Sequence, residues 1–96
     1  MVSSIEESLI NAFEMLFEEG VMSENIYDFI EETLVEDPSL CEIFRKKFKK
    51  ESDIERKEVL AKIVLSIESF EDGILFLKNE CNYNDEDFDG YKGYER

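Results

Sequence analysis

Apolar residues recur every three or four positions along most of the 96-residue chain, and this spacing restricts the fold to packed helices. The recurrence puts apolar side chains on one face of each α-helix, where they can pack against a neighbour. A single proline and four glycines are too few for a turn-rich sheet protein. The fold class is therefore predicted to be all-α. In the first segment the pattern runs through Ile5, Leu9, Ala12, Phe13, Leu16 and Phe17. The same spacing predicts core positions for Phe29 in the second helix and Ile54 in the fourth.

Capping residues divide this pattern into five predicted helices. Ser23 is suited to cap the second helix, and the Asp37-Pro38 pair separates the second helix from the third. Ser52 and Ser69 each begin a capping-box pattern, for the fourth and fifth helices. The predicted helices cover residues 4–19, 24–36, 38–50, 53–68 and 70–82.

The connections between these helices are short, which favours antiparallel neighbours in a small bundle. A chain of this length is expected to form one domain. A helical-repeat array is excluded, because no segment resembles another at a fixed period. The predicted organisation is a bundle of four to five short antiparallel helices over residues 1–82, followed by an irregular acidic tail over residues 83–96.

The composition removes the side chains on which most active sites depend. The chain has no histidine, so Ser-His and Cys-His pairs are excluded, and two cysteines alone cannot form a tetrahedral zinc site. Cys41 and Cys81 lie at or beside core positions and are interpreted as small buried apolar groups. No pair of carboxylates is marked out for acid–base chemistry. We therefore expect a protein that is not an enzyme.

The N-terminal residues MVSSIEES lack the basic and apolar regions of a signal peptide. No apolar run approaches the roughly 18 residues that span a bilayer. Two cysteines without a disulfide pattern are typical of a reducing compartment. A cytoplasmic protein that does not contact membranes is expected.

Charge is distributed very unevenly along the chain. Residues 1–42 contain twelve acidic residues and no basic one, residues 43–62 contain eight basic and four acidic residues, and residues 63–96 contain three basic and nine acidic residues. Like charges one helical turn apart cost about 0.2–0.5 kcal/mol per pair, whereas interspersed lysines would stabilise the helices. This arrangement favours a role in recognition, and a purely solubilising acidic surface is the alternative interpretation.

We expect the acidic face of the first two helices to bind a basic protein surface, because complementary charge steers and orients association. Carboxylates one turn apart are about 5–6 Å from one another, comparable to the phosphate spacing of a nucleic acid. The partner in the sharper version of this hypothesis is a nucleic-acid-binding protein. The predicted contact residues are Glu7, Glu14, Glu18, Glu24, Asp28, Glu31, Glu32 and Glu36.

In size, charge and predicted helicity the chain is similar to small acidic inhibitors from viruses and mobile elements, those that block CRISPR effectors among them, and to toxin-immunity proteins. Those inhibitors act by mimicking nucleic acid or by covering a basic surface. The basic run at residues 45–50 is interpreted as complementing the negative end of its own helix. A net charge of −14 opposes direct nucleic-acid binding by this chain.

The C-terminal segment contains the first half of a calcium-loop pattern. Asp85, Asp87 and Asp89 occupy the first three ligand positions, and Gly90 permits the sharp turn. The second half is missing, because the final ligand position is Arg96 instead of glutamate. No cofactor is expected apart from a weak Ca²⁺ site here. The alternatives to a protein-binding module are a small calcium-responsive domain that uses this site, and a helical homodimer with a purely structural role. The tail could also anchor a partner through Phe88, Tyr91 and Tyr94.

Overall fold

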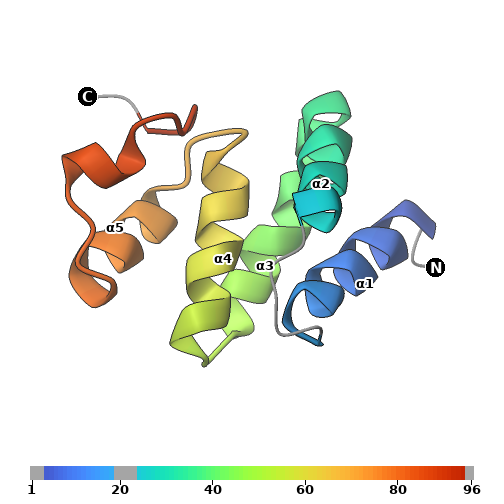
Figure 1. Ribbon diagram of the computed structural model, residues 1–96, viewed down its shortest axis with the longest axis horizontal. Helices are drawn as coiled ribbons and strands as arrows, with labels where there is room; N and C mark the ends of the chain where they lie inside the picture. Colours follow the sequence, from blue (N-terminus) through green and yellow to red (C-terminus); the bar gives the residue numbers. More distant parts are fainter. Residues whose placement is uncertain (1–3, 19–23, 95–96) are drawn as a thin grey trace. The chain divides into compact units, whose positions relative to one another are not determined.

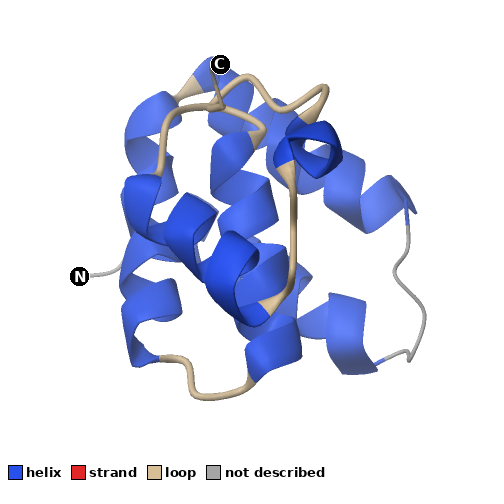
Figure 2. Ribbon diagram, turned by 90° about the vertical axis from the view of Figure 1, so that its left-hand side faces the viewer, coloured by secondary structure: helices blue, strands red, loops and turns tan. Residues whose placement is uncertain are grey.

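The computed structural model describes residues 4–18 and 24–94 (Figure 1). Within these residues the fold is all-α, which confirms the predicted fold class, and no strand is present (Figure 2). None of the helices in the described ranges is long and apolar enough to cross a membrane. Ser23 and residue 19, which belong to the predicted helix ends, lie outside the described residues. The elements are α1 (Ser4–Glu18), α2 (Glu24–Glu36), η1 (Pro38–Leu40), α3 (Cys41–Lys50), α4 (Ile54–Leu65), α5 (Glu71–Glu80) and η2 (Asp85–Phe88), where η denotes a 3₁₀ turn.

Contacts divide the chain after Leu40 into an N-terminal unit, Met1–Leu40, and a C-terminal unit, Cys41–Arg96. Residues 83–94, which the sequence sets apart as an acidic tail, pack onto α4 and α5 within the C-terminal unit.

The N-terminal unit is built on the packing of α1 against α2. Leu9, Phe13 and Leu16 of α1 are buried, as the helical spacing predicts, but Ile5 in the first turn of α1 is 41% exposed. On α2 the prediction is partly wrong, because Phe29 was expected in the core and its surface is 42% exposed. An amphipathic helix with a wide apolar arc buries only the part of that arc that a neighbour covers.

In the C-terminal unit α4 packs against both α3 and α5. A helix with two neighbours must bury more than one face. Ile54 was expected in the core but lies at the exposed beginning of α4, where 54% of its surface is accessible. The residues of α4 that are buried are Val59, Leu60, Ala61, Ile63, Val64 and Leu65.

Capping differs from the prediction at the starts of α4 and α5, and the predicted third helix differs in its helix type. Asp53, and not Ser52, caps α4, and its side chain accepts a hydrogen bond from the Arg56 backbone N–H at 2.9 Å. The capping box expected at Ser69 does not form, since Phe70 is the residue before α5 and makes no side-chain cap. The predicted third helix begins as the 3₁₀ turn η1 and becomes α-helical only at Cys41.

Gly73 lies within α5 where a glycine would normally weaken the helix. A β-carbon at this position would approach Cδ2 of Phe70 to 2.6 Å and the β-carbon of Ala61 in α4 to 3.1 Å. The glycine therefore permits the close approach of α5, the Phe70 ring and α4.

Residues 83–94 return from the end of α5 along α4. Asn82 adopts a left-handed backbone conformation (φ 60°), which asparagine tolerates better than most residues, and the chain reverses there. The N–H of Tyr83 then donates to the carbonyl of Leu77 at 3.0 Å, and the N–H of Gly93 donates to the carbonyl of Leu65 at 2.7 Å. Between these points Phe88 is buried with 1% of its surface exposed. This segment is a packed part of the fold.

Candidate protein-binding surface

A hollow of about 400 Å³ opens on the α1–α2 pair, and all of its lining residues belong to the N-terminal unit. We call it the α1–α2 groove. Met15 of α1 and Phe29 of α2 give it exposed apolar surface, with 44% and 42% of their surfaces accessible. None of its lining residues carries a charge. They are Ser8, Asn11, Ala12, Met15, Asn25, Ile26 and Phe29.

Acidic residues continue the same helical stripes that line this groove. Residues three and four apart share a helix face. On α1, Asn11 of the groove lies on a stripe with Glu7, Glu14 and Glu18. Of these glutamates, Glu7 and Glu18 are exposed and Glu14 is half-buried.

On α2, Asn25 and Phe29 of the groove lie on a stripe with Glu32 and Glu36, both of which are exposed. The spacing of these residues is four, three and four, so successive members lie about one turn apart. The α1–α2 groove is therefore uncharged at its centre and continues into carboxylates along both helices.

The remaining predicted contact residues form a second stripe on α2. Glu24, Asp28 and Glu31 follow one another at four and three positions, and the first two are exposed while Glu31 is half-buried. The eight predicted residues thus fall on three stripes, of which two include residues of the groove. No lysine or arginine occurs anywhere in residues 1–40, so the N-terminal unit supplies no basic side chain to neutralise these stripes.

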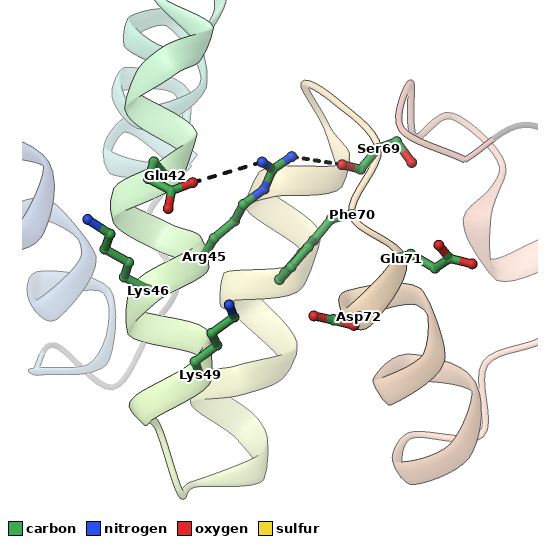
Figure 3. Close-up of a pocket in the computed structure, with 8 residues that line it drawn as sticks. All are labelled: Glu42, Arg45, Lys46, Lys49, Ser69, Phe70, Glu71 and Asp72. Atoms are coloured by element: carbon green, nitrogen blue, oxygen red, sulfur yellow. Dashed lines mark hydrogen bonds and ion pairs between the residues drawn. The ribbon is translucent and has the colours of Figure 1, made fainter.

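Figure 3 shows a different hollow, of about 320 Å³, between α3 and the start of α5. Arg45 reaches across it and donates to the backbone carbonyl of Ser69 at 2.9 Å, and its guanidinium pairs with Glu68 at 2.8 Å. The ring of Phe70 lies 5.7 Å from the guanidinium carbon. Arg45 therefore holds the α4–α5 connection to α3.

The charges that line this second hollow balance one another. Three cationic side chains and three carboxylates line it, so the lining has no net formal charge. They are Arg45, Lys46 and Lys49 against Glu42, Glu71 and Asp72.

A third hollow, of about 610 Å³, lies between α5 and the C-terminal segment. Its exposed apolar residue is Leu75, with 52% of its surface accessible. Lys78 on its wall is already engaged, 3.6 Å from Asp85 and 5.3 Å from the ring centroid of Tyr94. The sequence gives no sign of this hollow, because its charge and composition after residue 82 predict an irregular tail.

The predicted calcium ligands take part in protein contacts. Asp85 accepts a hydrogen bond from the hydroxyl of Tyr94 and lies beside Lys78. Asp87 accepts from the backbone N–H of Asn84 at 2.8 Å, in the capping box of η2. In the described ranges no group of three or more acidic or cysteine side chains could hold a metal ion. Asp85, Asp87 and Asp89 therefore do not assemble a Ca²⁺ site, because the segment folds as a capped 3₁₀ turn.

The predicted tail anchors are engaged within the C-terminal unit. The ring of Phe88 stacks on that of Tyr94 at a centroid distance of 4.3 Å and lies 5.5 Å from the ring of Tyr83. Tyr91 and Tyr94 are half-buried. Phe88 is not available to anchor a partner, since it already fills this core.

Neither cysteine has the surroundings of a nucleophile. Burial, together with a hydrogen bond and repulsion from the Glu68 carboxylate, raises the pKa of the Cys41 thiol to about 12. Burial, together with the charges of Glu58 and Glu80, raises the pKa of Cys81, which is half-buried. Thiolates, which are the reactive form, are therefore disfavoured at both positions near neutral pH.

Comparisons with protein-family models, with curated proteins and with solved structures found no match to this chain. The α1–α2 groove, with its shape and the charges beside it, is therefore the candidate functional site of this chain.

Met15 and Phe29 are the residues of this surface that sequence reasoning missed. Phe29 lies at helical spacing with Ile26 and Ile30 and was therefore assigned to the core. The available signal was that α2 carries apolar residues on more faces than one neighbour can cover, including Val35, which is 57% exposed. The periodicity alone does not show which apolar residues the neighbouring helix leaves uncovered.

Proposed function

We propose that this chain is a non-catalytic protein-binding module that engages a basic protein surface through α1 and α2. The observation that carries the proposal is an uncharged groove, with Met15 and Phe29 exposed, in a unit that has acidic stripes and no basic residue. Burial of this apolar surface against a partner contributes affinity. The surrounding carboxylates orient the partner and raise the rate of association.

The function we assign to such a module is that of an inhibitor or adaptor. Carboxylates at one-turn spacing, as in Glu24, Asp28 and Glu31, suit cationic side chains that otherwise contact phosphates. A chain of 96 residues that occupies such a surface would exclude nucleic acid from it. Competition between this protein and nucleic acid for one partner is therefore the expected mode of action.

The test is affinity capture from a lysate with three forms of the protein. Glu32→Lys with Glu36→Lys reverses two exposed charges beside the groove, and Glu80→Lys with Glu86→Lys makes the same change in net charge on the C-terminal unit. We expect the first variant to lose basic partners that the wild type and the second variant retain. Raised salt should release these partners, and duplex DNA should compete with the protein for them.

Retention of the same partners by both variants would show that the acidic stripe beside the groove is not the contact. Partners that resist salt but bind all three forms would likewise contradict the proposal. Circular dichroism of each variant confirms that the helices are intact before capture is compared.

A further inference from the structure

We infer that the α1–α2 groove receives a basic amphipathic helix of the partner, an inference that rests on the proposed function and specifies the form of the ligand. The chemistry required is a stripe of apolar side chains with lysine or arginine on both sides of it. Three features of the N-terminal unit lead to this requirement.

The first feature is the shape of the apolar surface. The groove is lined along α1 from Ser8 to Met15 and along α2 from Asn25 to Phe29. At a rise of about 1.5 Å per residue, the α1 wall is on the order of 10 Å long, or two helical turns. A helix presents apolar side chains at i, i+3, i+4 and i+7 over the same length, so its stripe matches an elongated groove between two helices.

The second feature is the position of the charges. The stripe of Glu7, Glu14 and Glu18 runs along α1, and the stripe of Glu32 and Glu36 runs along α2. Carboxylates thus flank the apolar centre from both helices. A partner helix with cationic residues on both edges of its apolar stripe would meet opposite charge on each side, whereas an acidic helix would be repelled.

The third feature concerns other occupants. Strand addition requires an unpaired strand edge, and the described residues contain no strand. The basic helix of a second copy, α3, is unsuited, because its apolar residues Phe44 and Phe48 are buried. A separate partner that carries its own basic helix therefore fits the groove best.

The test uses the full chain and three synthetic peptides of equal length. The first peptide has leucines at i, i+3, i+4 and i+7 flanked by lysines, the second has the same composition in scrambled order, and the third has glutamates in place of lysines. Titration calorimetry is expected to show binding of the first peptide, with the scrambled peptide at least about tenfold weaker, a difference of about 1.4 kcal/mol. The acidic peptide should not bind.

Variants assign the binding to the groove. Phe29→Ser removes apolar surface from the groove. Asn25→Arg keeps Met15 and Phe29 but adds a bulky cation to the groove wall. It replaces Phe29→Ser as the test if that variant is unstable. Each should weaken the amphipathic peptide by about tenfold or more. Leu75→Ser, which removes an exposed leucine from the C-terminal unit, is the matched control and should change nothing.

The outcomes separate this inference from the function on which it rests. One outcome is that the amphipathic and scrambled lysine peptides bind alike, and that Glu32→Lys with Glu36→Lys weakens this binding whereas Phe29→Ser and Asn25→Arg do not. That outcome overturns the helix-in-groove inference, but the acidic contact of the proposed function stands. If none of these variants changes peptide binding, both the acidic contact and the helix-in-groove inference are overturned. Failure of the first peptide to bind overturns the inference. A dimer of the wild-type protein that becomes a monomer in Phe29→Ser also overturns it, since a second copy would then fill the groove.

Discussion

The hydroxyl of Tyr83 donates a hydrogen bond of 2.7 Å to the carboxylate of Glu58, joining the segment after α5 to the middle of α4. The same segment is tied to the end of α4 by Gly93 and Leu65. Between the two ties lies the buried ring of Phe88. The segment that carries the most concentrated run of aspartates in the chain is therefore anchored by a tyrosine, a phenylalanine and a glycine.

The Tyr83–Glu58 contact predicts a loss of stability at alkaline pH. Burial, with the hydrogen bond to Glu58 and the Glu58 charge as further causes, raises the pKa of Tyr83 above its ordinary value of 10.0 in the folded protein. The unfolded chain ionises first, so this contribution is complete below about pH 10 and is lost as the pH rises toward the folded pKa. The free energy of unfolding should fall by on the order of 1 kcal/mol per pH unit in that window.

Tyr83→Phe isolates this effect, because it removes the titrating group and preserves the ring. Near neutral pH the variant should be less stable by about 1–3 kcal/mol, since Glu58 loses its partner. The difference between wild type and variant should then narrow above pH 10, measured by urea unfolding at several pH values. A difference that stays constant from pH 7 to pH 11 would contradict the assignment.

Phe88→Ala should destabilise the protein by about 3–5 kcal/mol, the usual cost of removing a fully buried aromatic ring. The physical reason is the cavity left beside Tyr94 and Tyr83, whose rings lie against Phe88. Leu75→Ala in α5 is the control, because Leu75 is exposed and should change stability by no more than about 0.5 kcal/mol. Urea unfolding, followed by circular dichroism, measures the stability of both variants. Equal unfolding midpoints for Phe88→Ala and the wild type would show that Phe88 is not part of the core.

Gly73→Ala should destabilise α5 even though alanine is the better helix former. The added β-carbon would meet the Phe70 ring at 2.6 Å, and that ring is held by an edge contact with Phe48 at 5.0 Å. Overpacking of this kind typically costs about 1–3 kcal/mol, which matches or exceeds the roughly 1 kcal/mol gained in helix propensity. Asn79→Ala, at an exposed position of the same helix, should instead be neutral or slightly stabilising. Thermal unfolding of Gly73→Ala and Asn79→Ala shows whether each substitution lowers or raises the unfolding midpoint, and a raised midpoint for Gly73→Ala would contradict the prediction.

Cys41 should resist thiol reagents in the folded protein. It is fully buried, and its raised pKa leaves almost no thiolate at pH 8. Cys81 is half-buried and should react faster under the same conditions. Mass spectrometry after timed alkylation measures both rates, with a urea-unfolded sample in which the two should react alike. Faster modification of Cys41 in the folded sample would contradict this placement.

The helical periodicity predicted elements whose ends the structure reproduces closely in α1 and α2. The expected ranges 4–19 and 24–36 compare with Ser4–Glu18 and Glu24–Glu36, residue 19 lying outside the described residues. Such agreement is expected where the start and stop signals are local, because a helix end depends on residues within one turn of it. Competing caps such as Ser52 and Asp53 differ by one position, and local sequence does not rank them.

The acidic stripes were readable from residue spacing, since side-chain positions on a single helix follow from its geometry alone. The exposure of Phe29, the burial of Phe88 and the need for glycine at position 73 were not readable. Each depends on which surface a second element covers, and an apolar residue at helical spacing looks the same whether a neighbour packs on it or leaves it open. Local interactions in the chain thus decided its helices and its charge pattern, whereas packing between elements decided the groove and the role of the C-terminal segment.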